Sequence, residues 1–166
     1  VFDGLATKSG LLLYKINTPI AHTGTTAATV IHSYEITVGS LSANDFLKFS
    51  LRHLSTNNAN NKTLKLWANT SNTISGATQL ATYTYTTNSG GVFWFKRTMF
   101  FQNSLTSQKI INTSLSHAND EVSYPNNGDQ SLTLNFANSV WILIEVTLAN
   151  AADTFTLNAY MNKIER

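Results

Sequence analysis

The chain has no cysteine, only two prolines and few charged residues, and these shortages narrow the possible folds and functions. Without cysteine, disulfides and thiolate metal sites are excluded. Charged residues make up 12% of the 166 residues, against roughly 25% in an average soluble protein. The formal net charge is +2 and the only adjacent basic pair is Lys96-Arg97. A basic stripe of the kind that binds nucleic acid is therefore missing, and we expect no nucleic-acid partner.

Long apolar runs are also missing. The longest apolar stretch, near Val140–Val146, is interrupted by Glu145. It is far shorter than the roughly 20 residues that a membrane-spanning helix requires. The first residues contain Asp3 and no basic start followed by an apolar core, so a signal peptide is not expected. We therefore expect no membrane partner.

Neutral polar residues take the place of the missing charges. The chain contains 23 Thr, 16 Ser and 19 Asn. Threonine suits strands because its branched Cβ packs well on a pleated surface, and Asn and Ser suit turns because their side chains bond to the local backbone. Sustained helical spacing of apolar residues is missing, whereas period-two alternation recurs along the chain. This composition predicts many short strands joined by many turns.

Alternation and turn residues together predict about nine or ten strands, with turns at the spacing typical of a sandwich or barrel. The expected strands are Leu11–Ile16, Val30–Val38, Phe46–Leu54, Lys62–Ala68, Gln79–Thr86, Val92–Gln102, Gln108–Asn112, Ser131–Phe136, Val140–Leu148 and Thr154–Ile164. Thr18–Thr29 is expected to be a loop or arm. We predict an all-β fold, a two-sheet antiparallel jelly-roll β-sandwich over residues 29–166. Residues 1–28 are expected to form an N-terminal arm or leader with a short strand.

Two expected strands carry large apolar side chains on both faces. In Val140–Leu148, Val140 and its alternate residues form the core face, and the opposite face carries Trp141 and Leu143. In Val92–Gln102, one of the two faces carries Trp94 and Phe100. A sandwich strand needs only one apolar face, so the second face must meet a loop or arm, another subunit, or a ligand. These four residues are the predicted subunit-interface residues.

A second set of aromatic residues suggests a sugar-binding platform. If Leu64 and Leu66 face the core, Trp67 of the same strand points outward, and Tyr83 and Tyr85 share one face of the next strand. Exposed Trp and Tyr on a flat β-face can stack on sugar rings. Trp67, Tyr83 and Tyr85 are therefore the predicted ligand-contact residues.

Motifs for catalysis and for cofactor binding are not found. Asp120-Glu121 is the only adjacent carboxylate pair and is interpreted as a solvated loop, since acid/base catalysis needs two carboxylates in one pocket. The four histidines lie at no recognisable metal-ligand spacing, and G-x-S-x-G and phosphate-binding glycine loops are missing. We expect no catalytic residues, no metal and no cofactor, and hence a protein that is not an enzyme.

The order of strands and turns resembles jelly-roll domains of bacteriophage virion proteins. The similarity covers roughly residues 29–166. It is carried by Ile31–Ile36, Gly39–Phe49, Lys65–Asn69, Ala81–Tyr83, Leu132–Phe136, Trp141–Val146 and Asp153–Tyr160. These segments form a strand-and-turn pattern without a catalytic signature.

The resemblance to tail fibres, head fibres, receptor-binding and decoration subunits implies a non-enzymatic function. It implies a structural module of the virion, homotrimeric, that contacts other virion proteins in fibre or capsid-surface assembly and contributes to attachment to a host surface glycan. The alternative function is a carbohydrate-binding module with an aromatic platform on a sheet face.

Overall fold

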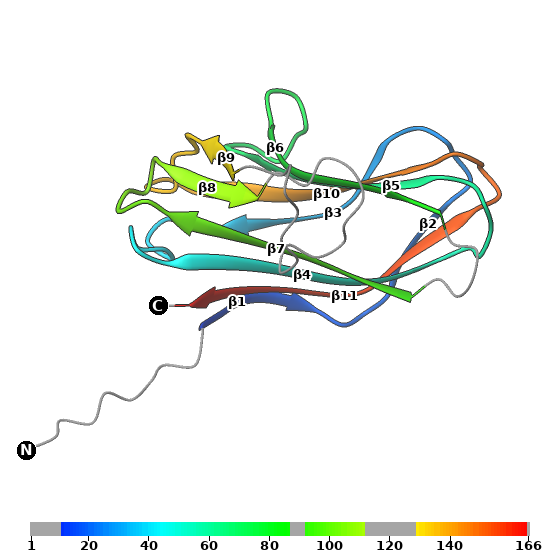
Figure 1. Cartoon of the computed structure of the whole chain (residues 1–166), viewed down its shortest axis with the longest axis horizontal. Helices are drawn as coiled ribbons and strands as arrows, with labels where there is room; N and C mark the ends of the chain where they lie inside the picture. The colour runs from blue at the N-terminus through cyan, green and yellow to red at the C-terminus, as the bar shows by residue number, and fades with distance from the viewer. Residues whose placement is uncertain (1–10, 87–91, 112–128, 166) are drawn as a thin grey trace, which may run out of the picture.

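The computed structural model describes residues 11–86, 92–111 and 129–165. These residues form the strands drawn in Figure 1. Their bounds are β1 Leu11–Ile16, β2 Ile20–Thr23, β3 Thr29–Ile36, β4 Phe46–Ser55, β5 Lys62–Asn69, β6 Thr78–Tyr85, β7 Val92–Phe101, β8 Gln108–Ile111, β9 Asp129–Leu132, β10 Val140–Leu148 and β11 Thr154–Glu165. Within these ranges, the structure contains no helix of the length and apolar character that crossing a membrane requires.

The strands form two antiparallel sheets, drawn in Figure 1, and buried side chains of both sheets form one shared core. The seven-stranded sheet has the order β1-β11-β4-β7-β8-β9, with β2 also paired to β11, and the four-stranded sheet has the order β3-β10-β5-β6. The strand pairs are nested, because β5–β6 lies within β4–β7 in the sequence and β4–β7 lies within β3–β10. Nested pairs divided between two sheets are the winding of a jelly roll, and the predicted fold class is confirmed.

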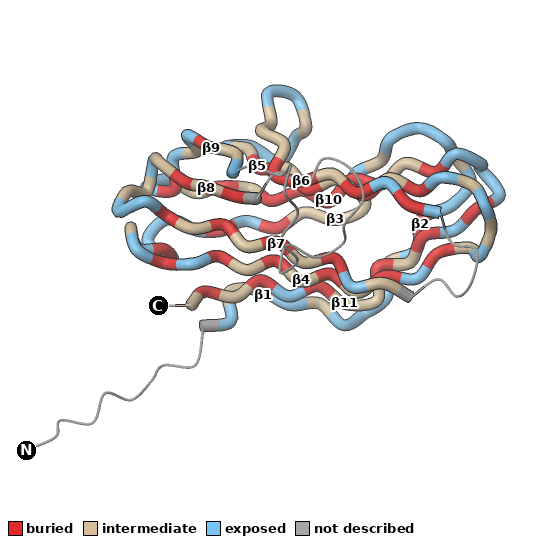
Figure 2. The backbone as a smooth tube through the Cα atoms, in the orientation of Figure 1, coloured by how far each residue is buried: buried red, intermediate tan, exposed pale blue. Residues whose placement is uncertain are grey.

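The core lies between the inner faces of the two sheets. In Figure 2, buried positions alternate with intermediate or exposed ones along β4, β5 and β11. The predicted core face of β10 is confirmed, since its five residues are fully buried: Val140, Ile142, Ile144, Val146 and Leu148. Burial of each such side chain contributes about 1.5–3 kcal/mol relative to an exposed position.

The described part of the expected N-terminal arm belongs to the sandwich. β1 pairs with residues 160–164 of β11, and β2 pairs with residues 154–157 of the same strand. The expected loop over Thr18–Thr29 is therefore wrong at Ile20–Thr23, which is β2. The β-branched Ile20 and Thr23 suit a short edge strand, and the edge of β11 supplies its hydrogen-bond partners.

The expected strand Ser131–Phe136 is also wrong in its bounds, since β9 ends at Leu132. The buried amide of Gln108 replaces the strand ladder beyond this point. Gln108 Nε2 donates to the Leu134 carbonyl at 2.9 Å, and the Leu134 N–H donates to Gln108 Oε1 at 3.1 Å. A side chain thus satisfies the backbone groups that a neighbouring strand would otherwise pair.

Two buried cations are held by the core. Arg97 points inward from β7, where its guanidinium lies 4.2 Å from the centre of the Phe95 ring and donates to the Lys96 carbonyl at 2.6 Å. Lys62 lies 3.4 Å from Asp153 at one end of the sandwich. Burial alone would raise the pKa of Asp153, but hydrogen bonds from neighbouring asparagines and the charge of Lys62 lower it below its ordinary value.

Candidate ligand-binding face

The outer face of the seven-stranded sheet combines apolar and basic side chains, and we call it the open face. Its outward residues include Leu12, Lys15, Phe46, Lys48, Ser50, Arg52, Leu54, Trp94, Lys96, Thr98, Phe100, Lys109, Asp129, Ala159, Met161, Lys163 and Glu165. Seven large hydrophobic side chains among the described residues are exposed, and five of them lie here: Leu12, Phe46, Leu54, Trp94 and Met161. An antiparallel sheet with one solvated face usually places polar residues on it, so this concentration of apolar groups marks a candidate contact surface.

Four residues from four adjacent strands form a row across the open face, which we call the central row. Lys15 of β1 lies opposite Met161 of β11. Met161 lies opposite Ser50 of β4, and Ser50 lies opposite Lys96 of β7. Neighbouring strands are about 4.8 Å apart, so the backbones at the two lysines of the row are about 14 Å apart. Trp94 precedes Lys96 by two positions and points to the same side of β7.

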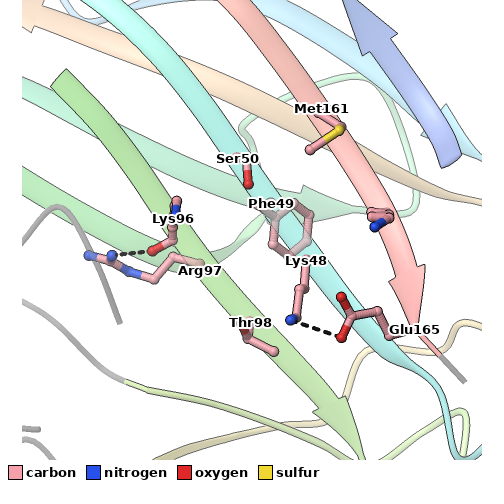
Figure 3. Close-up of a pocket in the computed structure, with 9 residues that line it drawn as sticks. Lys48, Phe49, Ser50, Lys96, Arg97, Thr98, Met161 and Glu165 are labelled. Carbon is pink, nitrogen blue, oxygen red and sulfur yellow. Dashed lines mark hydrogen bonds and ion pairs between the residues drawn. The ribbon is translucent and has the colours of Figure 1, made fainter. Parts of the chain in front are cut away.

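Three open hollows meet at the central row. The largest has a volume of about 490 Å³ and is lined by Ser50, Trp94, Lys96 and Met161. A second, of about 210 Å³, extends past Lys15, and a third, of about 180 Å³, is drawn in Figure 3. All three share Ser50 and Met161, and Figure 3 shows Ser50 between Lys96 and Met161. The largest hollow falls within the roughly 300–1,000 Å³ of small-molecule sites.

Positive charge is concentrated on the same face. Among the described residues, the open face holds six of the chain's 11 basic residues: Lys15, Lys48, Arg52, Lys96, Lys109 and Lys163. It holds two acidic residues, and each lies near a lysine. Glu165 lies 2.8 Å from Lys48, and Asp129 lies 4.0 Å from Lys109. Six positive and two negative charges leave an excess of four on this face, although the whole chain carries only +2.

The predicted platform of Trp67, Tyr83 and Tyr85 is not formed. Tyr83 and Tyr85 are each only 7% exposed and pack in the core, so their expected outward position is wrong. The physical reason is strand pairing, because Tyr83 lies opposite Leu64 and directly opposed residues share a face of the sheet. Trp67 does point outward but is half-buried, and Lys65 Nζ lies 5.5 Å from the centre of its ring.

The four predicted interface residues divide between the two outer faces. Trp94, with 51% exposure, and the half-buried Phe100 lie on the open face. Trp141 is half-buried on the outer face of the four-stranded sheet. Leu143 is only 1% exposed, so it offers no surface to another subunit in the described chain, and its predicted interface role is wrong. It lies between the opposed residues of β3 and β5, one of which is the large Trp67.

A chain of polar groups inside the core contains a histidine, a serine and a tyrosine. Tyr85 Oη lies 2.6 Å from Ser55 Oγ and 3.1 Å from His53 Nδ1. Burial lowers the pKa of His53 to about 4 and raises the pKa of Tyr85. All three side chains are buried, and His53 stacks on Phe155 at 4.9 Å between ring centres. A substrate cannot reach these groups, so their role is structural.

Groups of three or more His, Asp or Glu placed to hold a metal ion are absent from the part of the chain that the structure describes. The sequence pair Asp120-Glu121 lies outside the described residues. Of the residues that line the three hollows, Glu165 is the one carboxylate, and its partner is Lys48 at 2.8 Å. The hollows therefore present an aromatic ring, hydroxyls and amines to a ligand.

Sequence reasoning missed Lys15, Ser50 and Met161 as parts of a site. Alternation in β4 places Ser50 on the side of the strand away from the core, so the sequence does predict that its side chain points outward. Its neighbours on the surface come from strands far away in the sequence, and only the register of β1, β11, β4 and β7 brings them together. Trp94 was the one residue of this site with a sequence signal, as a large aromatic group on a second apolar face.

Comparison with known proteins adds two distant structural similarities. No protein-family model matches the chain, and no curated protein matches it. A "putative sugar binding protein" from Bacteroides thetaiotaomicron VPI-5482 aligns over 97% of this chain and 84% of its own, with 10% identity and a TM-score of 0.42. The infectious bursal disease virus Gx strain structure aligns over 96% of this chain and 42% of its own, with 10% identity and a TM-score of 0.24. Neither similarity carries an inference about function, and the resemblance to phage virion domains stays a prediction.

Proposed function

We propose that this domain is a non-enzymatic binding module whose open face binds carbohydrate. The observation that carries the proposal is the hollow where the Trp94 ring, the Met161 thioether, the Ser50 hydroxyl and the Lys96 amine meet. A pyranose has an apolar C–H face and a rim of hydroxyls. Trp94 offers an exposed aromatic face for the former, while hydroxyl and amine groups offer hydrogen bonds for the latter.

The chemistry of the hollows favours binding over hydrolysis. Glycoside hydrolysis uses two carboxyl groups that flank the scissile bond, roughly 5–9.5 Å apart. The residues that line the three hollows include one carboxylate, that of Glu165, which lies 2.8 Å from Lys48. A binding role therefore agrees best with the groups in place.

Calorimetric titration with cellohexaose, chitohexaose and hexagalacturonic acid tests the proposal. We expect at least one hexasaccharide to bind. Trp94→Ala should lower the affinity for that hexasaccharide by about tenfold or more, as expected for an aromatic residue at the centre of a contact. Phe46→Ala is the matched control, because Phe46 is exposed on the same face and outside the three hollows. It should change affinity by less than about twofold. Absence of binding to all three sugars, or equal losses in both variants, would contradict the proposal.

A second candidate function is assembly, with this domain as a homotrimeric subunit of a virion surface. The favouring observation is that five exposed large hydrophobic side chains share the open face, including Trp94 and Met161. The charge of the face opposes contact between two copies of it, because such a contact would bring the same excess of cations together. A contact with a different, acidic surface of another copy or of another virion protein avoids this repulsion and also leaves room for a host glycan.

Light scattering at several protein concentrations tests the assembly role. In that case the wild-type chain should have the mass of a trimer, and Trp94→Ser should lower the mass while it lowers folding stability by less than about 1 kcal/mol, since a half-exposed side chain contributes little to folding. A wild-type mass of one chain at all concentrations would exclude the homotrimer. An unchanged trimer in Trp94→Ser would place the subunit contact elsewhere.

A further inference from the structure

The class of sugar that suits the open face is set by the charge of that face. Among the residues that the structure describes, its cations exceed its acids by four, and both of these acids lie beside a lysine. A neutral sugar would leave this excess unchanged. A ligand with acidic groups would be attracted from within a Debye length of about 8–10 Å at moderate ionic strength, and would gain from each charge it meets.

The register places like charges directly opposite each other. Lys163 of β11 lies opposite Lys48 of β4, in the row next to the central row. Directly opposed like charges destabilise a sheet. Glu165 offsets the charge of Lys48 at 2.8 Å, and an anionic group of a ligand above the sheet would offset the charge of Lys163. This part of the face is better suited to an occupied state than to an empty one.

The central row suits an extended ligand. Lys15 and Lys96 close its two ends, and their backbones are about 14 Å apart across β1, β11, β4 and β7. This distance is greater than the width of a single pyranose. Between the two lysines lie Met161 and Ser50, and Trp94 lies two positions before Lys96 on β7, so a thioether and a hydroxyl face the middle of the row and charges face its ends.

We infer, on the basis of the proposed carbohydrate-binding function, that the ligand is a linear oligosaccharide of uronic acids lying along the central row. A uronic acid carries its charge on the C6 carboxylate and keeps its ring hydroxyls and the C–H face. It can therefore stack on Trp94 and bond to Ser50 while its carboxylates meet Lys15 and Lys96. A heavily sulfated sugar replaces hydroxyls that this site would use.

Single-stranded nucleic acid fits the largest hollow of this face less well. Proteins that bind it combine a basic groove with several aromatic side chains on which successive bases stack. In the largest hollow of the described structure, Trp94 is the one aromatic residue, and its neighbours there are Ser50, Lys96 and Met161. One ring suits one stacked sugar of an oligosaccharide.

Titration of hexagalacturonic acid and of its methyl ester tests the inference, because the two differ in charge and share the same rings. We expect the acid to bind about tenfold or more tightly than the ester at low salt, and this difference to shrink in 0.5 M NaCl. Equal affinity for acid and ester, or binding of cellohexaose alone, overturns the inference and leaves the carbohydrate-binding function standing. Tighter binding of a heparin hexasaccharide or of oligo-dT overturns it in favour of sulfate or nucleic acid. Absence of binding to every probe overturns both proposals.

Single-charge variants locate the contact. Lys15→Gln and Lys96→Gln should each weaken binding of the acid by about three- to fivefold more than they weaken binding of the ester, as expected for charge pairs at a surface. Lys109→Gln is the charge-matched control, because Lys109 lies on β8 outside the three hollows and beside Asp129. Equal losses in all three variants would mean that the face attracts anions without a defined site, which also overturns the inference.

Discussion

Both outer faces of the sandwich carry tryptophan and lysine, but these residues differ between the two faces in their exposure and in their contacts. On the outer face of the four-stranded sheet, which we call the closed face, Lys65 lies 5.5 Å from the centre of the Trp67 ring and 3.2 Å from Glu145. The neighbouring Leu143 is buried. On the open face, Trp94 is half exposed, and the lysines surround hollows.

Cross-strand partners account for this difference. On the closed face, Glu145 lies directly opposite Lys65, so a cation meets an anion. On the open face, Lys48 lies opposite Lys163, so a cation meets a cation. On the closed face Lys65 and Glu145 form an ion pair, whereas the described residues of the open face include four more cations than acids. Exposure of a tryptophan or a lysine therefore depends on register, and composition alone does not reveal it.

The largest expected change in stability comes from His53, which lies in the core that both faces share. Its pH dependence must be measured first, so that it is not attributed to either face. Burial lowers the pKa of His53 to about 4, against about 6.5 in an unfolded chain. The unfolded state then binds the proton more tightly than the folded state does. The contribution of neutral His53 to the free energy of unfolding is therefore fully present above pH 6.5, and it is lost as the pH falls toward 4. The loss should reach about 3 kcal/mol below pH 4.

Urea denaturation between pH 4 and pH 7 measures this loss. His53→Phe keeps a ring between Phe93 and Phe155 and removes the titrating group. In this window the variant should show a shallower pH dependence than the wild-type chain. The same slope in both proteins would assign the acid sensitivity to carboxylates instead, such as Asp153, whose lowered pKa acts in the same direction.

Sequence reasoning reached the sheets and the core because alternation is a local signal. The face of β10 could be read from five consecutive alternate residues, and it is the core face. Tyr83 was misplaced because its direction depends on Leu64, which lies opposite it on the neighbouring strand. The candidate site could not be predicted, since Lys15, Ser50 and Met161 become neighbours only through the register of strands far apart in the chain.

The second prediction compares the two tryptophans of the opposite faces. Trp67→Ala should lower the free energy of unfolding by about 2 kcal/mol, because its ring is half-buried and covers neighbouring groups. Trp94→Ala should lower it by less than about 1 kcal/mol, since about half of that side chain is already exposed. The binding assay should show the reverse, with the larger loss of hexasaccharide affinity in Trp94→Ala. Equal stability losses would mean that the open face is covered as fully as the closed face.

The smallest expected effect concerns the two lysines whose cross-strand partners differ. Lys65→Ala leaves the buried Glu145 carboxylate without its cation at 3.2 Å, and should cost about 1 kcal/mol of unfolding free energy because Lys65 itself is partly exposed. Lys163→Ala removes the like charge opposite Lys48 and should be neutral or stabilising by up to about 0.5 kcal/mol. Urea denaturation at pH 7 in low and high salt distinguishes the two, because salt screens the repulsion on the open face more than it screens the partly buried pair. A loss of stability in Lys163→Ala equal to that in Lys65→Ala would show that the open face is also neutralised within the chain, and that it holds no charge excess for a ligand.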